Sequence, residues 1–295
     1  MGATLAGGAH AAAAPFFQRH KLSVGIQLYS LGPDLAKELD AQLATVAKIG
    51  FKSVELAGYL GRTPAELRAA FDKAGLVCPS AHISPKGPSG FSGDLAKLAD
   101  EMHVIGVKSV MMPIFYIPDR LGNDLRGAGV QMTADDWKWN ADFLNEKAAV
   151  LKKAGIVSGY HNHNFEFAPL KDAKGGDTNG MEILLKGTDP SVVTFEMDAG
   201  WVTAAGHDPL VLLKAHPGRF TQMHVKDVKA TTKTNFELKQ DPTEVGGGMI
   251  DWKKLLPAAY AAGVRGFYYE QEPPFAHARL ESARISYDYL AKVVA

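Results

Sequence analysis

Short runs rich in β-branched and aromatic residues alternate with longer runs of helical periodicity from residue 23 to the end of the chain. Eight such pairs can be counted in the 295 residues, a length that suits one large α/β barrel or two medium domains. This alternation is typical of repeated βα units around a parallel sheet. No stretch between the units has the composition of a linker. The pattern therefore predicts a single (β/α)8 barrel over residues 21–295, with extended loops at its C-terminal face.

The predicted strands and helices are delimited by turn and capping signals. Thr63 and Thr133 are expected N-caps, with Pro64 at a first helical position and Glu66 and Asp136 three residues after each cap. The expected strands are residues 24–29, 53–56, 77–83, 109–114, 156–163, 192–198, 220–225 and 266–270. The expected helices include residues 34–49, 91–104, 133–154, 180–185 and 276–294. Two long polar segments, 115–132 and 226–248, are expected at the active-site rim.

The first 20 residues are set apart from the barrel. A tract of small residues, 5–14, ends in an Ala-x-Ala pattern before Pro15, as export signals do, although no charged segment precedes it. We expect residues 1–20 to be a leader and favour the remnant of an export signal. The protein is then expected to be periplasmic or exported. The alternative is a flexible leader on a cytoplasmic protein.

Charge and cysteine content exclude several classes of partner. Lys plus Arg and Asp plus Glu both total 32, so the net charge is zero and no basic field exists to hold nucleic acid. The single Cys78 excludes an internal disulfide. No run reaches the ~18 apolar residues that a membrane span requires. A small-molecule ligand is expected instead, and the sequence leaves open whether the protein forms a homo-oligomer.

One stretch, GYHNHNFEF at residues 159–167, concentrates two imidazoles, two amides and a carboxylate directly after an apolar run. Each such group buried without a partner would cost roughly 1–3 kcal/mol, so a bound metal and a hydroxylated ligand are expected there. Other strands place polar residues at every second position, which points them into the barrel because helices cover its outer face. These residues are Gln27, Tyr29, Ser53, Glu55, Ser80, His82, Thr194, Glu196, Asp198, Gln222, His224, Lys226, Tyr268, Glu270 and Glu272.

Three carboxylates and one imidazole among these groups form a candidate metal site. An oxygen-rich set of this kind suits Mn²⁺, Mg²⁺ or Co²⁺ and holds Zn²⁺ less selectively. Glu166 is out of step with His161 and His163, so the strand has to end or bulge before it. The predicted metal ligands are Glu166, Asp198, His224 and Glu270.

Five motifs in order carry a resemblance to a known family. They are Tyr160–Phe167, Phe195–Trp201, His224–Asp227, Val245–Trp252 and Tyr269–Gln271. On these motifs residues 22–294 resemble the sugar phosphate isomerase/epimerase family of xylose-isomerase-like TIM barrels. The resemblance implies that the same four ligands hold one divalent cation, often manganese. It also implies that Glu166 and Glu270 flank the substrate carbon from opposite faces and move a proton through an enediolate.

One position departs from that family. Ketose epimerases of the group carry a histidine three residues after the metal aspartate, where this chain has Trp201. An indole there suits stacking on a sugar face, so ketose 3-epimerase activity in particular is put in doubt. We expect the catalytic residues to be Glu166, Glu270, His161, His163 and Lys226. The expected substrate-binding residues are Tyr29, Glu55, His82 and Trp201.

The expected function is a metal-dependent isomerase or epimerase acting on a sugar or keto-sugar, with Mn²⁺ as the preferred ion. The same enolate also permits elimination, so a lyase or hydratase acting on keto-sugars or 3-keto-glycosides is the main alternative. A non-catalytic sugar-binding barrel and a DNA-repair endonuclease with a histidine-rich zinc cluster are the weaker alternatives. Neutral charge, and the presence of only one strong metal constellation in the sequence, oppose the endonuclease.

Simpler structural interpretations stand beside these roles. His82 could be a satisfied core histidine, and the Lys226-Asp227 pair could lie on the surface. The glycines at 246–248 are expected to form a flexible turn rather than a phosphate cradle, because the lysine of a P-loop is missing.

Overall fold

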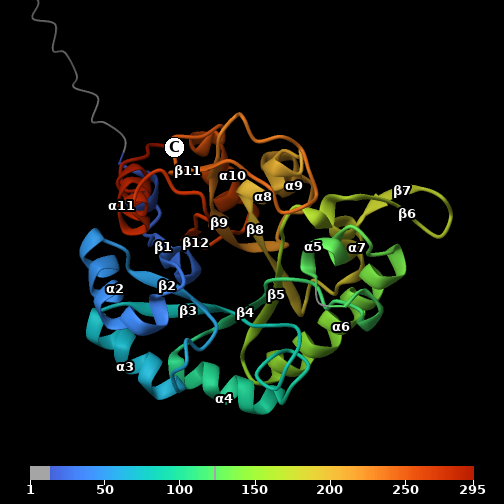
Figure 1. The fold of residues 1–295 in the computed structure, drawn as a ribbon, viewed down its shortest axis with the longest axis horizontal. Coiled ribbons are helices and arrows are strands. Elements are labelled where there is room, and N and C mark those ends of the chain that lie inside the picture. Colours follow the sequence, from blue (N-terminus) through green and yellow to red (C-terminus); the bar gives the residue numbers. More distant parts are fainter. Residues whose placement is uncertain (1–13, 123) are drawn as a thin grey trace, which may run out of the picture.

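Eight parallel strands close into one barrel in the computed structural model, which describes residues 14–122 and 124–295 (Figure 1). The strands follow the order β1-β12-β9-β8-β5-β4-β3-β2, and the closing pair aligns Gly25 with Tyr268. Their bounds are β1 (Gly25–Gln27), β2 (Ser53–Ala57), β3 (Val77–His82), β4 (Ser109–Met112), β5 (Val157–His161), β8 (Val193–Asp198), β9 (Phe220–Val225) and β12 (Gly266–Tyr269). The predicted single (β/α)8 barrel is confirmed.

Helices surround the barrel and shorter elements decorate its loops. The surrounding helices are α2 (Leu35–Ile49), α3 (Pro64–Ala74), α4 (Leu95–Ile105), α6 (Ala134–Lys153), α7 (Gly180–Gly187), α8 (Ala199–Ala204), α9 (Pro209–Ala215), α10 (Trp252–Ala262) and α11 (Arg279–Leu290). The shorter elements are α1 (Phe16–Arg19), α5 (Leu125–Gly129), the 3₁₀ turns η1 (Leu28–Leu31), η2 (Asp119–Leu121) and η3 (Phe165–Phe167), and the hairpins β6–β7 (Pro169–Lys171, Asp177–Asn179) and β10–β11 (Asp227–Val228, Pro242–Thr243). None of the helices in the described residues is long and apolar enough to cross a membrane.

Local signals explain where these helices begin. The reciprocal capping boxes predicted at Thr63 and Thr133 are both present, with Glu66 and Asp136 as the returning side chains. The helix predicted from residue 91 begins four residues later, because the carboxylate of Asp94 accepts the N–H groups of the first turn and fixes the start there.

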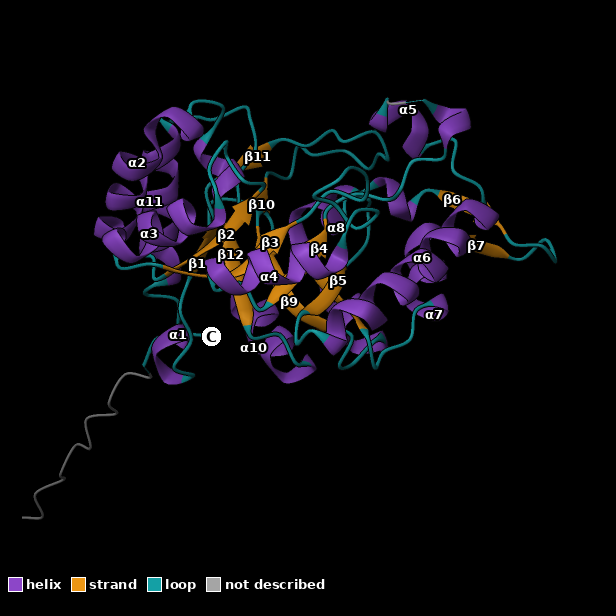
Figure 2. Cartoon of the chain, turned by 90° about the horizontal axis from the view of Figure 1, so that it is seen from below, coloured by secondary structure: helices purple, strands orange, loops and turns teal. Residues whose placement is uncertain are grey.

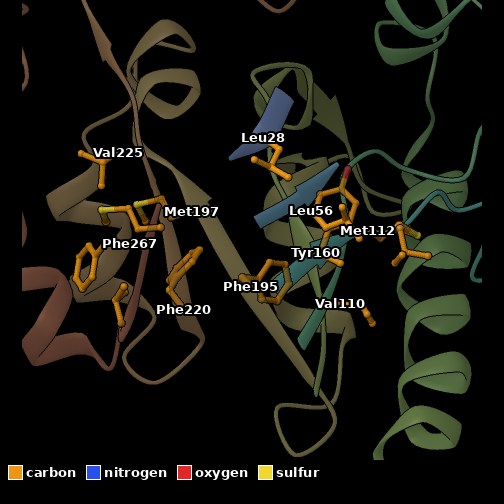
Figure 3. Close-up of a cluster of buried hydrophobic side chains, with 14 of the residues drawn as sticks. Leu28, Leu56, Val110, Met112, Tyr160, Phe195, Met197, Phe220, Val225 and Phe267 are labelled. Carbon is orange, nitrogen blue, oxygen red and sulfur yellow. The ribbon is translucent and has the colours of Figure 1, made fainter. Parts of the chain in front are cut away.

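Apolar side chains of the strands pack between the barrel and the helices (Figure 3). On β8, Phe195 and Met197 belong to this core, whereas the intervening Glu196 and the terminal Asp198 are buried polar groups. The same alternation holds on β9, where Met223 and Val225 flank His224. The outward positions therefore supply the hydrophobic burial, and the inward positions are left free to carry polar chemistry.

The C-terminal rim carries the long loops, and α1 lies at the opposite end of the barrel (Figure 2). On the rim, Asp227 is fully buried and accepts the N–H groups of Gly246 (2.9 Å) and Gly248 (3.2 Å) and the indole N–H of Trp252 (2.9 Å). A Cβ at residue 248 would lie 2.1 Å from the Asp227 carboxylate, so only glycine fits. The glycines expected to form a flexible turn are thus tethered, and Asp227 is not a surface residue.

Helix α1 packs against the N-terminal end of the barrel. Phe16 and Phe17 are buried, and the Phe16 N–H donates to the Val293 carbonyl at 2.8 Å. The Phe16 ring packs edge-on against Phe267 on β12. The structure therefore differs from the expected leader boundary at residue 20, because this segment is part of the folded barrel. The small-residue tract itself lies outside the described residues.

Replacing Phe16 with alanine should destabilise the protein by about 3–5 kcal/mol, as expected for the loss of a buried aromatic ring. Val211→Ala, at a side chain 63% exposed, is the matched control and should change the stability by less than about 0.5 kcal/mol. Chemical denaturation followed by circular dichroism measures both. Equal, small effects would show that α1 is not part of the folded unit.

Candidate active site

Side chains from seven strands or the turns directly after them meet at the C-terminal end of the barrel. One cavity of about 510 Å³ opens there, and six of the residues predicted for the site line it: Tyr29, His82, His161, His163, Trp201 and Glu270. Glu272 and Arg126 also line it, although neither was assigned a role from the sequence. Asp198, His224 and Lys226 are fully buried beneath it.

Asp198, His224 and Glu270 form the first candidate metal group, with ligand atoms within 4.8 Å of one another. His224 Nδ1 lies 2.9 Å from Glu270 Oε2 and 3.7 Å from Asp198 Oδ2. Asp198 caps helix α8 by accepting the Trp201 N–H on Oδ1 at 2.8 Å, which leaves Oδ2 buried without a hydrogen bond. Three of the four predicted ligands are therefore brought together.

Lys226 places one positive charge among the carboxylates of this group. Its Nζ lies 2.9 Å from Asp198 Oδ2, 2.8 Å from Glu270 Oε2 and 2.7 Å from Glu272 Oε1. Only the contact with Glu272 has the alignment of a hydrogen bond; the contact with Asp198 is an ion pair by distance alone. Burial lowers the pKa of Lys226, but the three carboxylates outweigh it and raise the pKa well above its usual value. The inward orientation predicted for Lys226 is confirmed.

A second candidate group is richer in nitrogen and shares His224. It contains His82, His161, Glu196 and His224. Glu196 Oε2 lies 2.8 Å from His82 Nε2, 3.1 Å from His161 Nδ1 and 3.3 Å from His224 Nε2, while Oε1 is buried without a partner. Burial and the nearby Glu55 raise the pKa of Glu196 to about 7. The sequence alternation placed Glu196 inside the barrel, but gave no sign that it would join the histidines.

Both groups fit a divalent cation chemically, because each holds a buried carboxylate oxygen that lacks a hydrogen-bond partner. Asp198, His224 and Glu270 offer two carboxylates and one imidazole, which suit Mn²⁺ or Mg²⁺. The histidine-rich group would suit Zn²⁺ better. The expectation of a single metal constellation is wrong, since two groups overlap at His224.

Glu55 is brought near the site but does not face the cavity. It is fully buried, and its carboxylate accepts from Gln27 Nε2 at 2.8 Å and from Ser80 Oγ at 2.5 Å. His224 Nε2 lies 2.6 Å from Glu55 Oε2. Burial raises the pKa of Glu55, but His82 and His224 outweigh it and lower the pKa to about 2. Glu55 sits two residues before the end of β2, contacts His224 and lies outside the cavity lining, so its contact with substrate stays a prediction.

Glu166 does not join either metal group. Strand β5 ends at His161, as required for Glu166 to change direction, but η3 then turns its carboxylate back toward the same strand. There it accepts the Tyr160 O–H at 2.6 Å and the His163 N–H at 2.9 Å. It is fully buried and outside the cavity lining. The structure therefore does not bring Glu166 together with Asp198, His224 and Glu270, and its role as a metal ligand and proton carrier stays a prediction.

The chain is similar to known proteins over most of its length. The profile of the xylose isomerase-like TIM barrel family matches residues 43–293. The chain belongs to this family. It is 24% identical over 295 aligned positions to an inosose dehydratase of Geobacillus thermodenitrificans, covering 88% of this chain and 94% of that protein.

Two solved structures from Parabacteroides distasonis are also similar, and both are described as sugar phosphate isomerase/epimerases. One is 26% identical with a TM-score of 0.73 and covers 96% of both chains. The other is 25% identical with a TM-score of 0.74, covering 92% of this chain and 98% of that one. Family and relatives together support an enzyme that acts on a sugar-like small molecule.

Burial raises the pKa of Glu166 to about 8, even though the Tyr160 O–H and the His163 N–H lower it. The folded protein thus binds a proton on this group that the unfolded chain, with a pKa near 4.5, releases as the pH rises. The contribution to stability is fully present below pH 4.5 and is lost as the pH rises to about 8.

Raising the pH from about 5.5 to 8.5 should therefore lower the unfolding free energy of the wild type more than that of Glu166→Gln, by at most roughly 3 kcal/mol. Denaturant titrations of the two proteins across this range measure the difference, and the other titrating groups cancel in the comparison. Parallel pH profiles would show that Glu166 is already ionised in the folded protein.

Proposed function

We propose that this protein is a carbon–oxygen lyase that removes a proton beside the carbonyl of a cyclic keto-sugar and expels a substituent from the next carbon. The observation that carries the proposal is that carboxylates line one side of the cavity and imidazoles line the other. Glu270 and Glu272 come from one side of the barrel, after β12. His82, His161 and His163 come from β3 and the end of β5, three or more strands away around the barrel.

This arrangement favours elimination over the two-carboxylate scheme expected from the sequence. Epimerisation by two glutamates needs a carboxylate on each face of the substrate carbon, and Glu166 is withdrawn behind Tyr160. Elimination needs a proton acceptor for the carbon-bound proton and a proton donor for the leaving oxygen, roles that one imidazole can fill in turn. A carboxylate wall facing imidazoles can supply both, and the relative from Geobacillus thermodenitrificans is a dehydratase by name.

Asp198, His224 and Glu270 would hold a divalent cation, for which Mn²⁺ is the preferred candidate. Such an ion, when bound, acts as a Lewis acid on the carbonyl and the neighbouring oxygen. Lys226 stays protonated between Asp198, Glu270 and Glu272, so one positive charge offsets part of the negative charge of the three carboxylates.

His163 is the best placed base. Burial, together with the Lys226 charge, lowers its pKa to about 3, so its ring is neutral at physiological pH. Its Nδ1 is buried without a hydrogen-bond partner, and its ring, which lines the cavity, lies 5.7 Å from that of Trp201, a side chain only 1% exposed. The imidazole takes the proton from carbon, the carbon–oxygen bond breaks with its electrons going to oxygen, and the imidazolium returns the proton to that oxygen.

Isomerisation or epimerisation of a keto-sugar is the second candidate function. It is favoured by the likeness to the two Parabacteroides distasonis structures, and it shares the first proton transfer. The outcomes separate at the second step, when the proton returns to carbon instead of to a leaving oxygen.

The protein is incubated with a panel of 3-keto-glycosides and free keto-sugars in D₂O, and the products are followed by NMR. We expect release of the substituent and formation of an unsaturated sugar. His163→Asn should slow this release by at least about 10²-fold, the usual contribution of a positioned acid–base group. His103→Asn, at an exposed helix position, is the control and should leave the rate unchanged. Deuterium entering the sugar without loss of the substituent would favour the isomerase and overturn the lyase.

A further inference from the structure

A second cavity of about 290 Å³ adjoins the active-site cavity and shares two lining residues with it, Tyr29 and Ala57. We call it the side cavity. The rest of its lining comes from the segment between β1 and α2, the first turn of α2, the loop after β2, the segment before α11 and the first residue of α11. These residues are Gly32, Pro33, Leu35, Ala36, Leu60, Pro273 and Arg279.

Tyr29 stands between the two cavities and is 57% exposed, although Leu28 and Ser30 on either side of it are buried. The turn η1 is pinned by the Gln27 side chain, which accepts the Tyr29 N–H at 3.1 Å. An exposed aromatic ring at the mouth of a cavity offers a flat apolar face with a polar tip, which suits contact with another ring.

The loop after β2 holds Leu60 in an unusual conformation. Its φ is +52°, and it lies between Gly58 at +76° and Gly61 at +72°. Left-handed backbone of this kind is uncommon for a leucine and costs of order 1–3 kcal/mol, whereas glycine would adopt it freely. The isobutyl group is thereby placed in the wall of the side cavity, which makes that wall apolar.

Most of the side cavity lining is apolar. It contains no carboxylate, and Arg279 is its one charged side chain. Nη1 of that guanidinium donates to the Ser30 carbonyl at 3.1 Å, and its Cζ lies 4.4 Å from the centre of the Phe275 ring. An uncharged ring entering the side cavity would find apolar walls, the face of Tyr29 and a guanidinium that already contacts an aromatic face.

From these observations we propose that the side cavity is a subsite for an uncharged aromatic substituent of the substrate, so that the enzyme takes aryl glycosides in preference to free sugars. The proposal rests on the proposed function in one respect: the aryl group would be the substituent expelled. The ring carbon loses its proton to the base, the bond to the glycosidic oxygen breaks, and that oxygen leaves with the proton as a phenol.

Binding of unoxidised glycosides tests the subsite without any reaction. Wild-type protein should bind p-nitrophenyl glucopyranoside at least tenfold more tightly than methyl glucopyranoside in calorimetry at millimolar concentration. Ala36→Trp, at an exposed position in the first turn of α2, places an indole in the side cavity. It should raise the Kd of the aryl glycoside at least tenfold more than that of the methyl glycoside, and Tyr29→Ala should act in the same direction.

Ala65→Trp is the matched control, because this exposed alanine occupies the same second position of α3 and lines no cavity described for the structure. It should leave both Kd values unchanged. Equal binding of the two glycosides, no binding of either, or equal effects of the two tryptophan variants would overturn the subsite.

Turnover separates this inference from the proposed lyase. A clear aryl preference in binding with no release from any 3-keto-glycoside would refute the lyase and leave the subsite standing. Release at equal rates from aryl and methyl 3-keto-glycosides, with no aryl preference in binding, would refute the subsite alone.

Discussion

Burying charge is unfavourable unless each charged group has an opposite partner, and the mouth of this barrel buries charges together so that they compensate one another. Lys226, fully inaccessible to solvent, contacts three carboxylates within 3 Å. One oxygen of Glu196 approaches three imidazoles. Removing any single partner would leave the others uncompensated, so the network specifies one arrangement of the site.

Hydrogen bonds below the mouth extend this constraint along the barrel axis. Ser109 donates to Gln222, Gln222 to Ser80, and Ser80 to Glu55, with distances of 2.9, 2.8 and 2.5 Å. Glu55 in turn meets His224 at 2.6 Å. Supporting contacts of this kind fix the ring orientation of a metal-binding histidine, so the interior of the barrel prepares His224 for the groups above it. The cavity then depends on residues that never reach it.

The barrel and the inward set of residues follow from local patterns, and for that reason the sequence predicts them well. Alternation along a strand is enough to turn Asp198, His224 and Lys226 inward. Alternation says nothing of depth, so it could not show that Glu55 lies below the cavity or that Glu196 meets the histidines. Glu166 lies apart from the other predicted ligands because a 3₁₀ turn after β5, which no periodicity predicts, turns its carboxylate toward Tyr160. The sequence does not predict the packing of Phe16, because the tract of small residues before it resembles an export signal and residues 1–20 are therefore set apart from the barrel.

The central claim is that one divalent cation is held by the oxygen-rich group under the cavity. Anomalous diffraction from crystals grown with Mn²⁺ tests it directly. The account predicts a single peak within coordination distance, about 2.0–2.5 Å, of Asp198, His224 and Glu270. A peak held instead by His82, His161 and Glu196, or the absence of any peak at the barrel mouth, would contradict it.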